Sequence, residues 1–420
     1  MSLKSGLVVA AAGLAAGSAG AQQQPASGPV AVYWMSAATT TGMGAMAGMG
    51  GMGGMGGRPG PGGAPQAQPK RPGFGSVMGG MLRGRGPFGG GGEEPGPGGG
   101  YGGGRPGMPP GFGGGGAPSH SLTLQLGSTQ RAQGEPAAAH LPPPDLQAGE
   151  RLPLVTPQVA PPEPPEPGEP PQMAQRPRGR MLIYWGCGEH AAAAPIVIDF
   201  SKIGPGMPMP HMPFVLANGG RPPSAGRFAT YGEWPNARTR ITVPPDGSLA
   251  GPHAVQGNYS PDIHFTLSPS QDFLPPLRLG PIAETPGGGK RVSWSPVAGA
   301  TGYFAWMFGA SDRGETVVMW SSGAEANMMG ALTDYLPQSE VRRLIAQRVV
   351  MPPQTTECVV PSEVVKASPF GMLSMIAYGE EANFSDPPRP AKGPWNLKWT
   401  VKVRRKSTTA TILGMPGGAG

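Results

Sequence analysis

Several features are missing from this sequence, and each absence excludes a class of protein. No HExxH, GxSxG or P-loop motif occurs, so no local signature of a zinc protease, an α/β-hydrolase or a nucleoside triphosphatase is present. There are only two cysteines, and no second Cys/His pair stands at the spacing of a structural zinc site. No segment beyond the first residues is long and apolar enough to predict a transmembrane helix.

The N-terminus, MSLKSGLVVAAAGLAAGSAGAQQQ, has the organisation of a signal peptide over residues 1–21. Lys4 supplies a positive charge, a short apolar run follows, and small residues precede a cleavage site near Ala21. No cysteine follows that site, which argues against a lipoprotein anchor. The mature protein is therefore expected to be periplasmic or secreted.

Glycine and proline are abundant, with 73 and 56 residues, and they are concentrated in residues 22–180. A Gly/Met/Pro/Arg tract covers 38–118, and 128–180 contains PPEPPEPGEPPQ. Such sequences bury too little apolar surface to offset the entropy lost on ordering. We expect long disordered segments here, with 128–180 acting as a stiff polyproline-like spacer.

Two islands within this region predict strands, at residues 29–37 and 121–128. The second alternates leucine with polar residues, as a half-buried strand does. Since an isolated strand is unstable, both are expected to dock onto a sheet that begins at Met181.

From residue 181 to 413 the sequence predicts an all-β fold of two β-sandwich-like domains, followed by a tail at 414–420. The first domain is expected at 181–275 and the second at 276–413. Short β-rich runs bounded by turn residues predict strands in the first domain at 195–200, 239–244 and 262–268.

The stretch RVSWSPVAGATGYFAWMF resembles the second and third strands of a fibronectin type III domain. The matching features are a strand that ends in Trp294, a proline turn and a strand led by Tyr303. GMLSMIAYGEEANFSDPP, at 371–388, is similar to the sixth strand of that family, and WNLKWTVKV would be its last. The resemblance covers roughly 276–410 and implies a binding or spacer module without catalysis.

One insertion departs from the fibronectin pattern. Within it Val341, Leu344, Ile345 and Val349 are spaced as one face of a helix, so a short helix is expected there.

The two cysteines, Cys187 and Cys358, allow alternative interpretations. In an oxidising compartment an even count favours a disulfide bond. The loop MLIYWGCGEH also brings Cys187 near Glu189 and His190, which leaves a nucleophilic cysteine with a neighbouring base as a hypothesis. A buried thiol is the third alternative.

Methionine suggests a metal function. GPGMPMPHMPF places four soft or borderline ligands close together, and these are Met207, Met209, His211 and Met212. Thioethers and imidazole suit Cu(I), so a periplasmic Cu(I)-binding protein is the alternative function. The alternative is that these methionines bind no metal, because Gly-Met tracts also arise by repeat expansion. Apart from Cu(I), no cofactor is expected.

The final predicted strand, at 395–406, alternates apolar and polar side chains. Between residues 389 and 406 there are seven basic residues and no acidic one. Such a strip would attract a partner protein or an anionic envelope polymer, and nucleic acid is not expected outside the cytoplasm. A lysine-rich edge strand that discourages edge-to-edge pairing is the alternative. The candidate anion-binding residues are Lys398, Lys402, Arg404 and Lys406.

Catalysis has little support in the sequence. A hydrolase would have to use His253 or His264, but the alternation of DIHFTLS places His264 and Asp262 on an outer sheet face. The expected function is therefore that of an exported, non-catalytic binding, adhesive or envelope-associated structural module.

Overall fold

The computed structural model describes residues 28–43, 117–157, 179–202, 215–311, 315–327 and 329–414. The predicted signal peptide, most of the Gly/Met tract and the methionine cluster at 207–212 lie outside these ranges. Within them, every helix is too short or too polar to cross a membrane.

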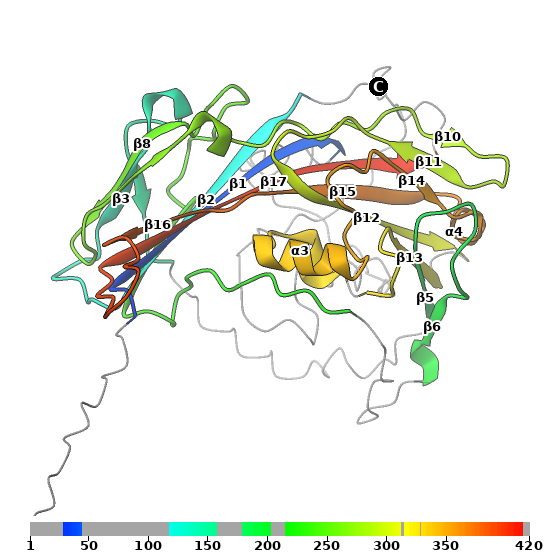
Figure 1. Ribbon diagram of the computed structural model, residues 1–420, viewed down its shortest axis with the longest axis horizontal. Coiled ribbons are helices and arrows are strands. Elements are labelled where there is room, and N and C mark those ends of the chain that lie inside the picture. The colour runs from blue at the N-terminus through cyan, green and yellow to red at the C-terminus, as the bar shows by residue number, and fades with distance from the viewer. Residues whose placement is uncertain are drawn as a thin grey trace, which may run out of the picture.

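A twisted ten-stranded sheet extends across the molecule (Figure 1). Its strands lie in the order β6-β5-β13-β12-β15-β17-β1-β2-β7, and β16 also pairs with β17. The strands are β1 Ala31–Gly42, β2 Ser119–Ser128, β5 Arg180–Trp185, β6 Ile196–Asp199, β7 Thr230–Trp234, β12 Ala300–Ser311, β13 Thr316–Ser321, β15 Gly371–Gly379, β16 Ala382–Asp386 and β17 Trp399–Leu413.

Two smaller sheets lie at opposite ends of the large one (Figure 1). The four-stranded sheet has the order β4-β3-β8-β9 and the three-stranded sheet the order β10-β11-β14. Their strands are β3 Ala138–Leu141, β4 Leu152–Leu154, β8 Gly251–Gly257, β9 Ile263–Leu267, β10 Ala283–Glu284, β11 Lys290–Ser293 and β14 Glu357–Val360. The helices are α3 Gln338–Ala346 and α4 Ser362–Ala367, with short 3₁₀ turns η2 Pro144–Leu146, η4 Phe200–Lys202, η5 Pro269–Gln271 and η7 Gly330–Thr333.

One face of the large sheet packs against both smaller sheets. At one end Tyr33 and Met35 of β1 and Val401 and Val403 of β17 form a core with the four-stranded sheet. At the other end, β12 and β15 form a second core with β11 and β14. The segment that joins the two cores contains Ser270 and Asp272 and crosses the middle of this face. There the buried Arg405 donates hydrogen bonds to the backbone carbonyls of these two residues.

The opposite face is covered at its centre by α3 (Figure 1). Phe304 of β12 and Ile376 of β15 pack there against Val341 and Leu344 of the helix, which are fully buried. The predicted helix is therefore confirmed, although α3 ends at Ala346, before the last predicted position of its apolar face.

The strand β17 occupies an interior place in the sheet. It runs parallel to β1 along one side, and it pairs with β16 and then with β15 on the other. The edge-strand interpretation of the basic terminal segment is therefore wrong, because both sides of the strand are hydrogen-bonded. The strand also begins at Trp399, so the predicted residues 395–398 precede it.

Two further strand predictions need correction. The spacer interpretation is wrong for residues 138–154, which contain β3 and β4 and bury Leu146, Leu152 and Leu154 in the core. The predicted strand at 239–244 is a loop, because it ends in Pro244 with Pro245 directly after it, and Ile241 is exposed.

Most of the β predictions agree with the structure. The islands at 29–37 and 121–128 lie in β1 and β2, in the same sheet as β5. Alternation along β9 buries Ile263, Phe265 and Leu267 as expected. The boundary between the two predicted domains, after residue 275, stays a prediction, and strands from both sides of it share the large sheet.

Candidate functional site

The basic residues of β17 project from one face because side chains alternate along a strand. Lys402, Arg404 and Lys406 therefore lie in a row on the face that carries α3. Parallel pairing with β1 brings Trp34 opposite Lys402 and Ser36 opposite Arg404. The sheet thus places an aromatic side chain within a row of cations.

Three cations and two aromatic rings on this face form a chain of contacts. The Trp34 ring centroid lies 5.5 Å from Lys402 Nζ and 4.9 Å from Arg404 Cζ. The Tyr335 ring centroid lies 4.5 Å from Arg404 Cζ and 4.3 Å from Lys406 Nζ. We call the set Lys402, Trp34, Arg404, Tyr335 and Lys406 the cation–aromatic ladder. Each such contact contributes about 0.5–2 kcal/mol, more where water is excluded.

The two outer rungs of the ladder are electrically balanced. Lys402 forms an ion pair with Glu381 at 2.8 Å, and Lys406 forms one with Asp334 at 2.7 Å. Burial alone would raise the pKa of Asp334, but the neighbouring Lys406 and Arg404 hold it below its usual value. Asp334 is therefore ionised at neutral pH and pairs with Lys406.

The central rung, Arg404, is different. Its side chain is only 9% exposed, and its Nε donates to Ser36 Oγ at 2.7 Å. Among the described residues no carboxylate lies within ion-pair distance, and its terminal nitrogens make no hydrogen bond. Neither terminal nitrogen of Arg404 is both sealed from solvent and without a hydrogen-bond partner. Burial lowers the pKa of Arg404, which nonetheless stays charged.

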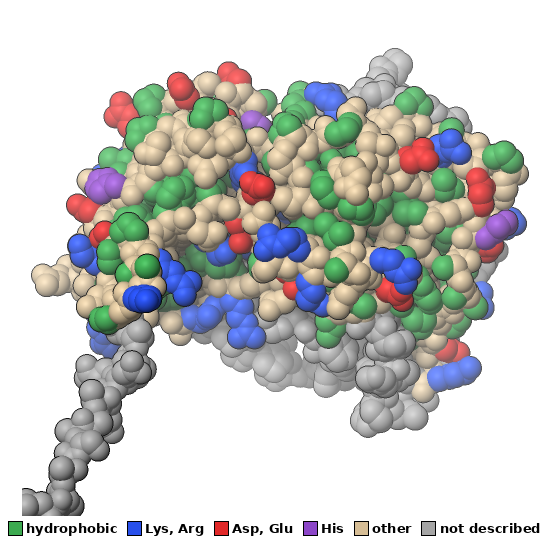
Figure 2. Space-filling view, in the orientation of Figure 1, with side chains coloured by type: hydrophobic (Ala, Val, Ile, Leu, Met, Phe, Trp, Pro, Cys, Tyr) green, Lys and Arg blue, Asp and Glu red, His purple; other side chains and the backbone are tan. Residues whose placement is uncertain are grey.

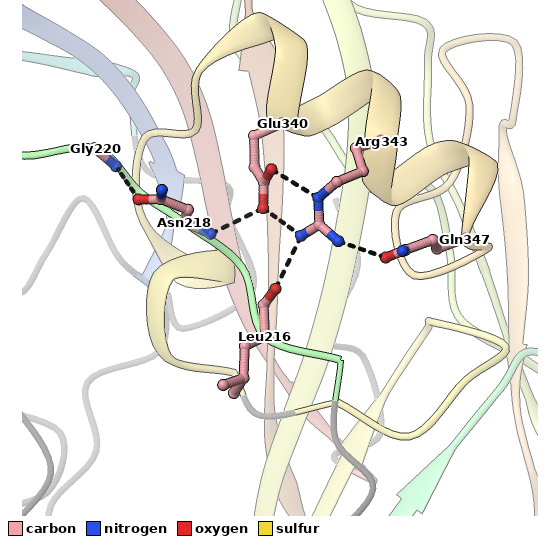
Figure 3. A network of polar contacts seen from close by, with 6 residues as sticks. All are labelled: Leu216, Asn218, Gly220, Glu340, Arg343 and Gln347. Carbon is pink, nitrogen blue, oxygen red and sulfur yellow. Dashed lines mark hydrogen bonds and ion pairs between the residues drawn. The ribbon is translucent and has the colours of Figure 1, made fainter. Parts of the chain in front are cut away.

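A segment after the methionine cluster is held beside the ladder by α3. Arg343 donates to Leu216 O at 2.9 Å and to both oxygens of Glu340, and Glu340 accepts from Asn218 N at 2.9 Å (Figure 3). Gly220 is near Trp34: a Cβ there would lie 3.5 Å from the ring. The left-handed φ of Gly220, +73°, favours glycine at this turn.

Lys398, the fourth predicted anion-binding residue, does not join the ladder. It precedes β17 and forms an exposed ion pair with Asp386 at 3.2 Å. The structure therefore brings three of the four predicted basic residues together. Several Lys and Arg side chains lie below the centre of the visible face (Figure 2).

The cysteines form a disulfide bond, with Cα atoms 5.2 Å apart. It fastens the loop after β5 to β14. The hypothesis of a nucleophilic Cys187 is therefore wrong, because no free thiol exists. Its neighbours also make structural contacts: Glu189 accepts from Thr285 Oγ1 at 2.5 Å, and His190 contacts Glu363 at 3.1 Å.

His253 lies in the core, in a hydrogen-bonded chain that joins the four-stranded sheet to β1. Its Nε2 contacts Leu249 O at 2.7 Å, its Nδ1 contacts His140 Nε2 at 3.1 Å, and His140 Nδ1 contacts Tyr33 Oη at 3.0 Å. Because a carbonyl only accepts, each imidazole is neutral and donates through Nε2, and Tyr33 donates to His140. Burial lowers the pKa of His253 to about 4, and it also lowers the pKa of His140 well below its usual value.

The remaining predicted site residues do not form a site among the described residues. His264 is exposed on the outer face of β9, as its alternation predicts. Met207, Met209, His211 and Met212 lie outside the described residues. Among the residues with coordinates described, no group of three His, Cys, Asp or Glu side chains is arranged to hold a metal ion.

Sequence reasoning missed the aromatic partners of the ladder. Trp34 lies 368 positions before Lys402 in the chain, and the parallel pairing of β1 with β17 has no local signal. Tyr335 lies in the insertion, just before α3. No protein family model, curated protein or solved structure matches this chain.

Proposed function

We propose that this protein is an exported, non-catalytic binding module, and that the ladder is its contact surface for an anionic partner. The observation that carries the proposal is the Arg404 guanidinium. It contacts the rings of Trp34 and Tyr335, is bonded at Nε, and has no carboxylate within ion-pair distance among the described residues. A largely buried charge whose opposite charges all lie beyond ion-pair distance is unfavourable, so a bound anion would supply a missing interaction.

The arrangement also favours binding because it exists before any ligand arrives. Stacking and the bond to Ser36 fix the Arg404 side chain, so little rotamer entropy remains to be lost on association. A guanidinium held in one plane offers donors at defined positions, which a mobile surface lysine does not.

We further propose that residues 276–413 form a fibronectin type III-like unit built into the larger sheet. The strand orders β10-β11-β14 and β13-β12-β15-β17, with a shared core between them, support this. Trp294 and Tyr303, which carry the resemblance, pack with ring centroids 5.5 Å apart. The additions are the α3 insertion and the pairing of β5 with β13 and β1 with β17.

Export is part of the proposal. The disulfide bond supports it, because such bonds persist in oxidising compartments. The predicted signal peptide accounts for how the chain would reach one.

A binding measurement tests the function. The mature chain from Gln22 is passed over immobilised dextran that carries sparse, isolated carboxymethyl groups and over plain dextran, at low and at physiological salt. We expect binding to the carboxylated polymer only, weakening as salt rises because the contact is electrostatic. Arg404→Gln should lose most of this binding, while Arg291→Gln, an exposed arginine of β11, should keep it.

Equal binding to the two dextrans, or an equal loss in Arg291→Gln, would contradict the proposal. Circular dichroism and thermal unfolding of each variant show whether a loss of binding reflects a loss of fold. Arg404→Lys keeps the charge and serves as the second variant if Arg404→Gln unfolds.

A further inference from the structure

Building on the proposed function, we infer that Arg404 binds a single, isolated carboxylate presented by a peptide, and not a continuous polyanion. The inference depends on the geometry of the guanidinium and on the charges that flank it. Its Nε is already bonded to Ser36, and the ring centroids of Trp34 and Tyr335 lie 4.9 Å and 4.5 Å from its Cζ. A ligand is left only the edge that carries the two terminal nitrogens.

That edge matches a carboxylate. Two terminal N–H groups lie parallel in the guanidinium plane, and a planar carboxylate accepts both with its two oxygens. The ring contacts and the bond to Ser36 restrict the rotation of the guanidinium, so the ligand must approach along these two donors. A lysine ammonium at the same place would be a point charge without this directionality.

The flanking charges limit the ligand to one negative charge. The ladder holds three cations, Lys402, Arg404 and Lys406, and two of them are paired with Glu381 and Asp334. Three positive and two negative charges leave a net charge of +1. A dianionic phosphate would exceed that charge.

A continuous polyanion fits less well still. Residues two apart on a strand are separated by about 7 Å, so the two paired carboxylates lie on either side of Arg404 at short range. Successive charges of a polyphosphate or a polyuronate would face them and be repelled. Peptides, in contrast, present isolated carboxylates at a side chain or at the C-terminus.

Matched small peptides test the inference. Ligand-observed NMR on the mature chain would compare acetyl-tetra-alanine with a free C-terminal carboxylate and the same peptide as its C-terminal amide. We expect millimolar binding of the acid and none of the amide. In Arg404→Lys the affinity for the acid should fall about tenfold or more, since one charge-assisted hydrogen bond is lost. Arg291→Gln should bind as the unmodified chain does.

Polyphosphate and polygalacturonate are the decisive competitors. If either binds more tightly than the peptide acid and depends on Arg404, the isolated-carboxylate inference is overturned while the proposed anion-binding function stands. Equal binding of the acid and the amide overturns it as well. If none of these probes binds, both the inference and the proposed function fail.

Discussion

Replacing Cys187 and Cys358 together by alanine is expected to lower the free energy of unfolding by up to about 5 kcal/mol on the chain-entropy model. The bond closes a loop with a sequence separation of 171 residues, so removing it greatly enlarges the unfolded ensemble. It also frees the loop after β5 from β14, where Cys358 is buried in the core between the sheets.

Denaturant unfolding of the oxidised protein and of the double variant measures this difference. A reductant should destabilise the unmodified protein by a similar amount and leave the double variant unchanged. A difference below about 1 kcal/mol would show that the bond adds little to the constraint already imposed by the sheets.

Acid is expected to destabilise the contact between the four-stranded sheet and β1. His253 has a folded-state pKa of about 4, below the unfolded value near 6.5, so the unfolded chain binds the extra proton between these pH values. Its contribution to stability is complete above pH 6.5 and falls as the pH decreases toward 4. The loss reaches about 3 kcal/mol at pH 4, and the lowered pKa of His140 adds to it in the same direction.

The structural reason is the direction of the hydrogen bonds. His140 and His253 each donate through Nε2 and accept through Nδ1. A proton added to Nδ1 of His253 faces the Nε2–H donor of His140, and a proton on either ring places a charge within the core. Around them lie Tyr33, which is also fully buried, and Phe265, which stacks on His253.

A matched pair of variants isolates this effect. His253→Gln keeps a donor and an acceptor without titrating in this range, so its stability should fall less between pH 7 and pH 4.5. His264→Gln, on the exposed face of β9, should follow the unmodified protein. Denaturant unfolding at several pH values gives the slopes, and identical slopes for His253→Gln and the unmodified chain would disprove the role of this chain of histidines.

How far the sequence predicts the fold depends on whether the signal is local. Alternation in β9 and β17 and the helical spacing of Val341 and Leu344 were sufficient to place those elements. Composition misled for residues 138–154, because proline and charge nearby obscured the few leucines that reach the core. At 239–244 the β-rich residues had no strand to pair with, and they form a loop.

The sequence predicted the cations of the candidate site but not their aromatic partners. The row of cations followed from period-two alternation along the last strand, and the even cysteine count favoured the disulfide bond among three alternatives. The stacking of Trp34 and Tyr335 on Arg404 could not be predicted, because it depends on β1 lying parallel to β17. Long-range pairing of that kind leaves no pattern within either segment.

The most direct test of the central claim observes the Arg404 guanidinium itself. In a nitrogen-15-labelled sample, the resonance of its side chain is assigned by its disappearance in Arg404→Lys, and acetyl-tetra-alanine is then titrated in. The account predicts that this resonance shifts progressively with the acid and stays in place with the C-terminal amide. Shifts confined to other arginines, or no shift at Arg404 at saturating peptide, would contradict it.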